Sequence, residues 1–468
     1  MRLLPMILLI AACGESAITS PDPDPEPEVR TVQLSLESGG GQKAPQGLRV
    51  DAPVVIQARF ETGELAPGVS VSANVTGGGG RVEQATAQTD AEGRASFEWT
   101  LGTGYSQSLR VQAEGSNAVL VSAVATYRYF QPPDDQDGWE VAAMDAPRPE
   151  LLFAEVDGIR SGRWSGIHSL LIAHQGKLVF EEYWPGGNSS GQQINWDRFT
   201  AHEVQSASKS YRSALIGMAI DRGLIGGVDE PLSGFFPDYQ FNAGKEAITL
   251  EHVLTMSTGL EWNESGAAAG NTSNHLSQMY RTPPSNWTGF VLNQPLQFTP
   301  GGTWVYNTGA SIMLNDILAR GTGMQVANFV REFMADPTES DVLPGVGNPL
   351  GAVTRPRDML RLGQVFLSDG MWKETRVLSE DWVEESLTER FQFSGDVSYG
   401  YQWWMRTLRT RTPRTYRVQY ASGNGGQYII LVDDLDLVIV STGGNFGSSL
   451  MNQIWPILEQ GVLAAFER

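Results

Sequence analysis

Hydrophobic and polar positions follow different patterns in different parts of the 468-residue chain. From Thr31 to Tyr127, short runs alternate apolar with polar residues, and Gly, Asp and Asn turns separate these runs. Alternation of this kind is typical of strands with one buried face, so the region predicts a small β-sandwich. The expected strands are VQLSLES, PVVIQARF, VSVSANV, RASFEWTL, LRVQAEG and VLVSAVAT.

The region from Pro149 to Arg468 mixes Gly-punctuated strands with longer helical stretches. One hairpin is expected to turn at Gln175–Gly176 and another within Asp433–Asp436. The helical stretches between them are SKSYRSALIGMAIDRG, TLEHVLTM, SIMLNDILARG and RDMLRLGQVFLSDG. Because strands come early and late in this region and helices in the middle, we predict an antiparallel sheet built from both ends, with a helical part. The fold class is α/β to α+β.

The chain begins with one basic residue, a short apolar run and its only cysteine, in the sequence MRLLPMILLIAAC. This pattern resembles a bacterial lipoprotein signal, in which residues 1–12 are removed and Cys13 becomes the lipid-bearing N-terminus. The run is too short to span a bilayer. We therefore expect acyl chains to hold the protein on a membrane of the bacterial cell envelope, at its periplasmic or surface face. The alternative is an ordinary secretory signal with an incidental cysteine.

Two further segments are expected to act as spacers. Residues 13–30 include SPDPDPEPEVR, where alternating proline and acid favour an extended chain. Residues 128–148 include FQPPDDQDGWE, a polar stretch with two prolines that predicts a linker. The sandwich between them, residues 31–127, contains TDAEGRASFEWTLGTG, which resembles the bacterial Ig-like repeats of invasin-type surface proteins. This module has no cluster of titratable groups, so we expect spacing or adhesion from it.

The overall charge argues against one class of partner. The chain has 33 basic and 53 acidic residues and a net charge of −20, so a nucleic-acid backbone would be repelled. The five histidines show none of the spacings typical of zinc sites. We expect no nucleic-acid partner, no metal and no cofactor.

The start of the stretch VQSASKSYRSALIGMAIDRGLI predicts a nucleophile beside a base. Residues three apart share a helix face, so Ser206 and Lys209 place a hydroxyl beside an amine. A serine hydroxyl needs a group that takes its proton, and a desolvated lysine can do so while an arginine cannot. The rest of the helix is apolar and ends at Gly223, so we expect it to be buried with its N-terminus at a cleft. The alternative is a helix start with N-capping serines and a snorkelling lysine.

Two downstream segments suit the same chemistry. In PGGTWVYNTGASIML, Tyr306 stands on a turn just before a helix, which would aim its phenol into a pocket. In YASGNGGQYIILV, a Gly-rich corner precedes a strand, and the backbone N–H of Gln427 is expected to form an oxyanion hole with that of Ser206. Taken alone, Tyr306 is more typical of a core aromatic and GNGG of a plain turn.

Five segments together resemble the serine β-lactamase and penicillin-binding-protein-like family, in its class C-like branch of esterases, peptidases and nylon-oligomer hydrolases. They are HEVQSASKSYRSALIGMAIDRG, ITLEHVLTMSTGLEW, PGGTWVYNTGA, RPRDMLRLGQVFLSDG and GNGGQYIILV. The resemblance covers residues 149–468 and implies a β-lactamase-like fold. It implies Ser206 as the acylated nucleophile, Lys209 as the proton acceptor or its organiser, and Tyr306 as a second acid/base group. Whether Lys209 or Tyr306 is the base stays open.

The sequence departs from this family at two motifs. The Y-x-N box is YNT here, so Thr308 stands where an amide side chain is usual, or Asn307 takes its role in a shifted turn. The K-T-G box is Asn424, Gly425 and Gly426, which lack the cation that would pair with the carboxylate of a penicillin. We expect these residues to bind substrate, and that substrate to be an ester or an uncharged amide rather than a β-lactam.

Other enzyme classes find little support in the sequence. GNSSG fits the G-x-S-x-G elbow of another hydrolase fold, but polar residues rather than a helix follow it, so we expect Ser189 in a loop. The adjacent Glu181 and Glu182 follow a strand, where neighbours face opposite ways, which argues against a two-carboxylate glycosidase. The alternative to a serine hydrolase is a catalytically idle surface receptor or adhesion protein with a hydrolase-like domain.

Overall fold

The computed structural model describes residues 31–128, 131–242, 244–265, 274–340, 352–393 and 395–468. The chain divides into two compact units, with the boundary after Ala125. The predicted signal, Cys13 and the spacer of residues 13–30 lie outside the described residues, so they stay predictions. None of the helices within the described ranges is long and apolar enough to cross a membrane.

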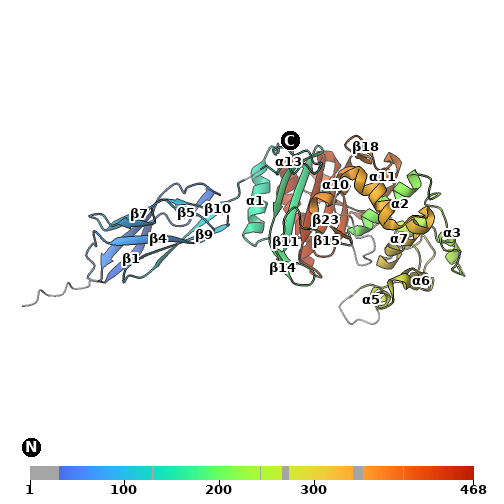
Figure 1. The fold of residues 1–468 in the computed structure, drawn as a ribbon, viewed down its shortest axis with the longest axis horizontal. Coiled ribbons are helices and arrows are strands. Elements are labelled where there is room, and N and C mark those ends of the chain that lie inside the picture. Colours follow the sequence, from blue (N-terminus) through green and yellow to red (C-terminus); the bar gives the residue numbers. More distant parts are fainter. Residues whose placement is uncertain (1–30, 129–130, 243, 266–273, 341–351, 394) are drawn as a thin grey trace, which may run out of the picture. The chain divides into compact units, whose positions relative to one another are not determined.

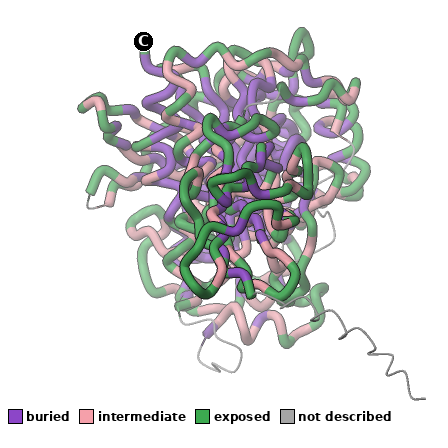
Figure 2. The backbone as a smooth tube through the Cα atoms, turned by 90° about the vertical axis from the view of Figure 1, so that its left-hand side faces the viewer, coloured by how far each residue is buried: buried purple, intermediate pink, exposed green. Residues whose placement is uncertain are grey.

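The first unit consists of antiparallel strands, as the alternating pattern predicts (Figure 1). One sheet has the order β1-β3-β7, a second has the order β2-β10-β9-β4-β6, and β5 pairs with β8. Along β1, Val32 and Leu34 are buried while their neighbours are exposed. Figure 2 colours the backbone of the chain by burial. The bounds are β1 Val32–Ser38, β2 Gln42–Pro45, β3 Val54–Phe60, β4 Ser70–Gly77, β5 Arg81–Val82, β6 Thr86–Gln88, β7 Arg94–Phe97, β8 Trp99–Thr100, β9 Ser106–Ala113 and β10 Val119–Thr126. This arrangement is compatible with a small sheet domain.

An eight-stranded antiparallel sheet forms the centre of the second unit, in the order β12-β11-β24-β23-β22-β21-β20-β19. Strands from both ends of the region pair directly, since β11 lies between β12 and β24. The predicted antiparallel sheet is therefore confirmed. The bounds are β11 Ile167–His174, β12 Lys177–Tyr183, β13 Gly186–Gly187, β14 Gln193–Ile194, β15 His202–Gln205, β16 Ala352–Thr354, β17 Met371–Trp372, β18 Thr375–Arg376, β19 Phe391–Gln392, β20 Val397–Tyr399, β21 Trp404–Arg409, β22 Thr415–Gly423, β23 Gln427–Val432 and β24 Leu437–Gly443.

Both predicted hairpins are present. β11 turns into β12 through Gln175 and Gly176, which have φ values of 52° and 76°. Positive φ at both central residues gives the turn whose twist matches that of the flanking strands. β23 turns into β24 through a short 3₁₀ helix, Asp433–Leu435, followed by Asp436 at φ 50°. β11, β23 and β24 are almost entirely buried, whereas β12 at the edge of the sheet is half-buried over much of its length.

Helices cover both faces of this sheet (Figure 1). On one face lie α1 and the C-terminal helix, and on the other lie α10 and the helical part around α2 and α7. The bounds are α1 Pro149–Arg160, α2 Ser208–Asp221, α3 Leu232–Phe235, η1 Lys245–Ala247, α4 Leu250–Leu254, α5 His275–Tyr280, η2 Pro284–Asn286, α6 Trp287–Leu292, α7 Thr308–Thr322, α8 Val326–Val330, η3 Arg331–Ala335, α9 Asp336–Thr338, α10 Pro356–Leu367, α11 Glu380–Leu387, η4 Asp433–Leu435, η5 Ser449–Gln453, α12 Ile454–Ile457, η6 Leu458–Val462 and α13 Leu463–Phe466.

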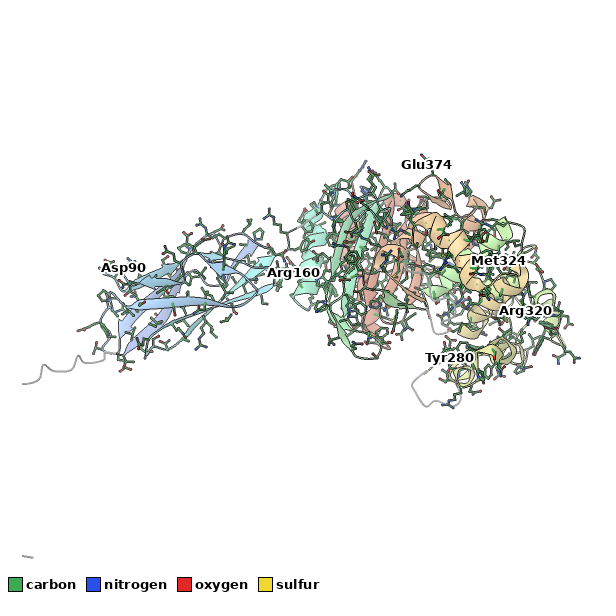
Figure 3. The ribbon with its side chains drawn as sticks, in the orientation of Figure 1. Asp90, Arg160, Tyr280, Arg320, Met324 and Glu374 are labelled. Atoms are coloured by element: carbon green, nitrogen blue, oxygen red, sulfur yellow. The ribbon has the colours of Figure 1, made fainter. Side chains whose placement is uncertain are left out.

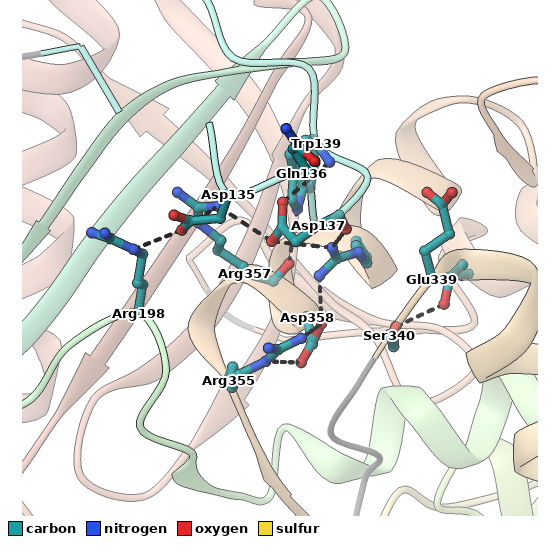
Figure 4. Close-up of polar contacts among 12 residues, drawn as sticks. Asp135, Gln136, Asp137, Trp139, Arg198, Glu339, Ser340, Arg355, Arg357 and Asp358 are labelled. Atoms are coloured by element: carbon teal, nitrogen blue, oxygen red, sulfur yellow. Dashed lines mark hydrogen bonds and ion pairs between the residues drawn. The ribbon is translucent and has the colours of Figure 1, made fainter. Parts of the chain in front are cut away.

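Residues 131–148 of the segment that the sequence predicts as a linker form part of the second unit instead (Figure 4). Asp137 lies 3.2 Å from Arg357 Nη1 and 3.3 Å from Arg361 Nη2, and both guanidinium groups are buried. Burial raises the pKa of Asp137, but the two guanidinium groups outweigh this effect and hold that pKa below its usual value. A buried cation needs such a counter-charge. The polar composition of this segment therefore serves ion pairing rather than solvation.

Apolar contacts hold the same segment in place. Trp139 is 4% exposed and packs edge-on against Trp372, with ring centroids 4.9 Å apart. Its indole N–H donates to the backbone carbonyl of Arg357 over 3.3 Å. Val141 then forms a parallel bridge with Leu178 at the β12 edge of the sheet. These residues form part of the second unit's core.

Candidate active site

Ser206 stands on a tight turn between β15 and α2. The preceding residue, Gln205, has a φ of 50°, a conformation that non-glycine residues rarely adopt. The backbone N–H of Lys209 donates to the carbonyl of Ser206 over 3.0 Å, which closes the turn ahead of the helix. The regular helix begins at Ser208, so Ser206 precedes the first helical turn and its hydroxyl is half-buried.

α2 is buried around its whole circumference from Ser208 to Ala219, as the sequence predicts. Gly223, at φ 67°, follows the C-cap residue Arg222 and ends the helix. A helix of this kind carries its polar side chains into the interior, where each needs a partner. The N-terminal turn therefore holds its serines and its lysine at the centre of the unit.

Lys209 is 4% exposed, and its amine contacts the two other side chains of the predicted site. Its Nζ lies 3.0 Å from Ser206 Oγ and 4.8 Å from the centroid of the Tyr306 ring. In the described part of the chain, no carboxylate lies within ion-pair distance of this amine, whereas Lys177 and Lys373 pair with glutamates. The structure thus brings Ser206, Lys209 and Tyr306 together.

The turn that carries Tyr306 is anchored to the end of α4. The backbone N–H of Val305 donates to the carbonyl of Met256 over 2.8 Å, and that of Asn307 to the Met256 sulfur over 3.3 Å. Met256 is buried and has a φ of 59°, a rare conformation for a bulky residue. The position of the Tyr306 phenol therefore depends on the backbone and sulfur of Met256, which lies outside the turn that carries Tyr306.

The Gly-rich corner lies against the strand that leads to Ser206. A Cβ on Gly423 would come within 2.2 Å of the Val204 carbonyl, so only glycine permits this approach. Gly425 and Gly426 have φ values of 97° and 102°, which L side chains rarely adopt. The Gln427 side chain donates to the carbonyl of Gly443 over 2.6 Å. Gln427 begins β23 beside this corner, and its part in an oxyanion hole with Ser206 stays a prediction.

Hydrogen bonds also fix Asn424 and the residues after Tyr306. The side-chain oxygen of Asn424 accepts from the N–H of Gly447 over 2.8 Å. That of Asn307 caps α7 by accepting from the N–H of Ala310, also over 2.8 Å. Thr308 donates to Glu264 through its hydroxyl and its N–H, both over 2.8 Å. The structure engages these side chains in the scaffold, and substrate binding by Asn307, Thr308 or Asn424 stays a prediction.

A buried guanidinium, that of Arg212, lies near Ser208 and Tyr306, and the sequence reasoning missed it. Arg212 is 8% exposed, and its Nη1 donates to Ser208 Oγ over 3.2 Å. Burial lowers the pKa of Arg212 to about 10, and the phenols of Tyr280 and Tyr306 oppose this effect. Tyr280 ends α5 on the helical side of the unit (Figure 3), and burial raises its pKa to about 12. A positive charge therefore lies close to the phenol of Tyr306.

Gln402 is a second residue that the sequence reasoning missed. It is buried, has a φ of 63°, and links three helices to the β20–β21 turn. Its side-chain N–H₂ donates to the carbonyls of Val253 and Leu254, and its backbone carbonyl accepts from Ser210. Its side-chain oxygen accepts from Ser311 of α7. This residue fixes α2, which carries Lys209, against α7, which follows Tyr306.

His202 lies on β15, just before the turn that carries Ser206, and contacts His168. His168 Nδ1 and His202 Nε2 lie 2.9 Å apart, and each residue is 1% exposed. His202 Nδ1 lies 3.1 Å from the carbonyl of Glu203, so it donates there and its Nε2 accepts from His168. Burial lowers the pKa of both imidazoles to about 4. The pair is therefore neutral in the folded protein at neutral pH.

This pair predicts a loss of stability in mild acid. Below pH 6.5 the imidazoles bind protons in the unfolded chain, whereas in the folded protein they bind protons only near pH 4. The free energy of unfolding therefore decreases as the pH is lowered. For His202 the loss between pH 7 and pH 5 is about 2 kcal/mol. Urea unfolding at these two pH values should show a smaller difference in His202→Gln than in the wild type. An equal difference in both proteins would contradict the assignment.

The sequence features of other enzyme classes do not form a second site. Ser189 is exposed in the turn between β13 and β14, as expected. Glu181 binds Arg357 in a bidentate ion pair, with distances of 2.7 and 2.9 Å. In the part of the chain that the structure describes, no three His, Cys, Asp or Glu side chains gather closely enough to hold a metal ion.

The fold and this geometry agree with comparisons to known proteins. The beta-lactamase family model matches residues 165–443, which is more than half of the chain. The chain belongs to the beta-lactamase family. The matched residues include β11 and β24 at its ends, and Ser206, Lys209, Tyr306 and the Gly-rich corner lie between them. The β-lactamase-like fold predicted from the sequence is confirmed.

Several known proteins are similar to this chain. The 6-aminohexanoate-dimer hydrolase of Paenarthrobacter ureafaciens is 26% identical over 255 residues, which cover 49% of this chain and 62% of that enzyme. A penicillin-binding protein homolog from Caulobacter crescentus has a TM-score of 0.55 at 16% identity, over 69% of this chain and 98% of that one. A family VIII carboxylesterase has a TM-score of 0.51 at 16% identity, over 66% of this chain and 95% of that one. The structural likenesses concern the fold.

Proposed function

We propose that this beta-lactamase-family hydrolase cleaves an ester or an amide through an acyl-enzyme on Ser206. The observation that carries the proposal is the 3.0 Å separation of Lys209 Nζ from Ser206 Oγ, in a buried place where none of the carboxylates that the structure describes lies within ion-pair distance of the amine. An amine there can accept the hydroxyl proton directly, which makes the oxygen nucleophilic. Tyr306, whose ring lies against the same amine, can share this proton.

The first half-reaction transfers the acyl group to the enzyme. Ser206 Oγ attacks the substrate carbonyl while its proton passes to Lys209 or Tyr306. The backbone N–H groups of Ser206 and Gln427 are the proposed donors for the oxyanion that develops on the carbonyl oxygen. The same proton then passes to the leaving alcohol or amine, the scissile bond breaks, and the acyl group stays on Ser206 as an ester.

The second half-reaction restores the free enzyme. Water loses a proton to the base and attacks the acyl carbonyl, and Ser206 regains its proton as the carboxylic acid leaves. Each group thus returns to its starting state without a cofactor. No further reactant is needed.

Two observations favour esters and uncharged amides over β-lactams. The corner formed by Asn424, Gly425 and Gly426 carries no cation that could pair with a substrate carboxylate. The names of two similar proteins specify a carboxylesterase and a hydrolase of the 6-aminohexanoate dimer. We therefore propose a small-molecule ester or amide as the substrate.

A substrate panel tests this proposal. We expect the wild type to hydrolyse members of a panel of 4-nitrophenyl esters and anilides, and Ser206→Ala to lose at least about 10³-fold in kcat/KM. Ser189→Ala is the matched control, because this exposed serine lies in a loop away from the site, and it should keep wild-type activity. If neither the wild type nor Ser206→Ala hydrolysed any member and Ser206 took no fluorophosphonate adduct, the chain would be a catalytically idle receptor or adhesion protein, whereas equal activity of the two would refute Ser206 as the nucleophile.

We further propose that the chain is held on a membrane of the bacterial cell envelope through lipid on Cys13. The proposal rests on the sequence MRLLPMILLIAAC, since this segment lies outside the described residues. Cys13→Ser should move the full-length protein from the membrane fraction to the soluble fraction after expression in a bacterium. Unchanged membrane association of this variant would refute the anchor.

A further inference from the structure

We propose that the site selects substrates with a flat apolar group next to the scissile bond, and that Trp304, Phe393 and Trp404 bind that group. These three residues are named the aromatic wall. The inference rests on the proposed function, because the wall has a role only if Ser206 attacks a substrate there. It adds a substrate class and three specificity residues to that function.

The rings of the aromatic wall contact one another in all three pairs. The ring centroids are 4.8 Å apart for Trp304 and Phe393, 5.6 Å for Trp304 and Trp404, and 6.1 Å for Phe393 and Trp404. The residues come from three elements: the turn before α7, the β19–β20 hairpin and strand β21. Tyr399, which is 1% exposed, packs edge-on beneath Trp304 and Trp404.

The aromatic wall is continuous with the reacting groups. Tyr306 stacks on Trp404 at 6.3 Å with an interplanar angle of 30°, and lies 5.9 Å from Trp304. The centroid of the same Tyr306 ring also lies 4.8 Å from Lys209 Nζ, and this amine lies 3.0 Å from Ser206 Oγ. Successive contacts through Tyr306 and Lys209 therefore connect the aromatic wall to Ser206.

Burial distinguishes the aromatic wall from core aromatics. Trp304, Phe393 and Trp404 are only half-buried, as is Tyr306, whereas Trp403 on the same strand segment is 0% exposed. Large aromatic surfaces left partly open to water cost free energy unless a ligand covers them. A flat group can cover several rings at once through stacked and edge-on contacts.

The residues of the aromatic wall itself favour an uncharged occupant. In the Gly-rich corner, the Asn424 side chain is already bonded to the backbone of Gly447. Neither this corner nor the aromatic wall contains a lysine, an arginine or a carboxylate. A flat, uncharged group such as an aryl ring therefore matches the wall better than a charged one.

Two ester series test the proposal on the full-length protein. The acyl series compares 4-nitrophenyl acetate with 4-nitrophenyl 3-phenylpropionate, and the alcohol series compares ethyl with benzyl esters of one acid. We expect the aryl member of one series to exceed its small counterpart by at least about tenfold in kcat/KM. The series that shows this preference identifies which side of the scissile bond faces the wall.

Variants assign the preference to the wall. Phe393→Ala and Trp404→Leu should each reduce the aryl preference at least about threefold, mainly through KM. Phe241→Ala is the matched control, because this half-buried ring packs on Tyr239 at 5.1 Å and should leave the preference intact. Phe393 lies on an edge hairpin, so its variant is expected to fold, which thermal melting would verify.

The outcomes separate this inference from the proposed function. Fluorophosphonate labelling of Ser206 and ester turnover without any aryl preference would overturn the inference alone. An aryl preference that both wall variants keep would also overturn it. Absence of both labelling and turnover would refute the proposed function, and the inference with it.

Discussion

Replacing Lys209 with arginine is expected to abolish turnover while the protein stays folded. Arginine keeps the positive charge but cannot give up its proton at neutral pH, so the Ser206 hydroxyl loses the acceptor 3.0 Å away. Loss of a general base costs about 10²–10⁴-fold, and we expect kcat/KM to fall by about that factor. Steady-state ester hydrolysis measures the loss, and circular dichroism verifies the fold.

Two further variants make this result specific. Lys209→Met has a similar shape without an amine and should be as inactive as Lys209→Arg, which separates lost proton transfer from crowding by the larger guanidinium. Lys373→Arg is the matched control, because Lys373 forms a surface ion pair with Glu339 at 2.6 Å. It should keep full activity. Retained activity of Lys209→Arg at neutral pH would contradict the role of Lys209 as a base.

The second large effect concerns the segment before α1. A fragment that begins at Pro149 should melt at least about 10 °C below one that begins at Thr126. The shorter fragment lacks Asp137, which leaves the buried Arg357 and Arg361 with a missing counter-charge, a change that costs about 3–5 kcal/mol for a buried pair. It also lacks Trp139, which fills space beside Trp372.

Thermal melting of the two fragments, followed by circular dichroism, gives the comparison. Asp137→Asn in the full-length protein isolates the ionic part, and it should lower the melting temperature of the second unit by less than the truncation does. Equal melting temperatures for the fragments starting at Thr126 and Pro149 would show that this segment is the linker that its composition indicates.

The contrast between these regions shows what local sequence can predict. The hairpins at Gln175–Gly176 and Asp433–Asp436 were predictable because turn residues and alternating apolar positions are local signals. The closeness of Ser206 and Lys209 was predicted from their spacing of three, but Ser206 lies on the turn before α2, and the i→i+3 hydrogen bond of that turn brings the two residues together. Tyr306 lies far along the chain from both, and only the family resemblance placed it with them.

The missed features depend on tertiary contacts. Residues 128–148 are predicted as a linker because the segment is polar and contains two prolines, yet Asp137 pairs with buried arginines of α10 that lie far along the chain. Similarly, half-exposed and core aromatics look alike in YGYQWW, where Trp403 is buried and Trp404 contacts Tyr306. The turn at Gln402 decides which ring faces which side, and its φ of 63° is not readable from residue type.

The most direct test of the central claim is a mass measurement of the covalent adduct. Intact wild-type protein incubated with a fluorophosphonate should gain one adduct, and peptide mapping should place it on Ser206. Ser206→Ala should gain none, and Lys209→Met should react at least about 10²-fold more slowly. An adduct on another residue, or equal labelling rates in the wild type and Lys209→Met, would contradict a nucleophile activated by the neighbouring amine.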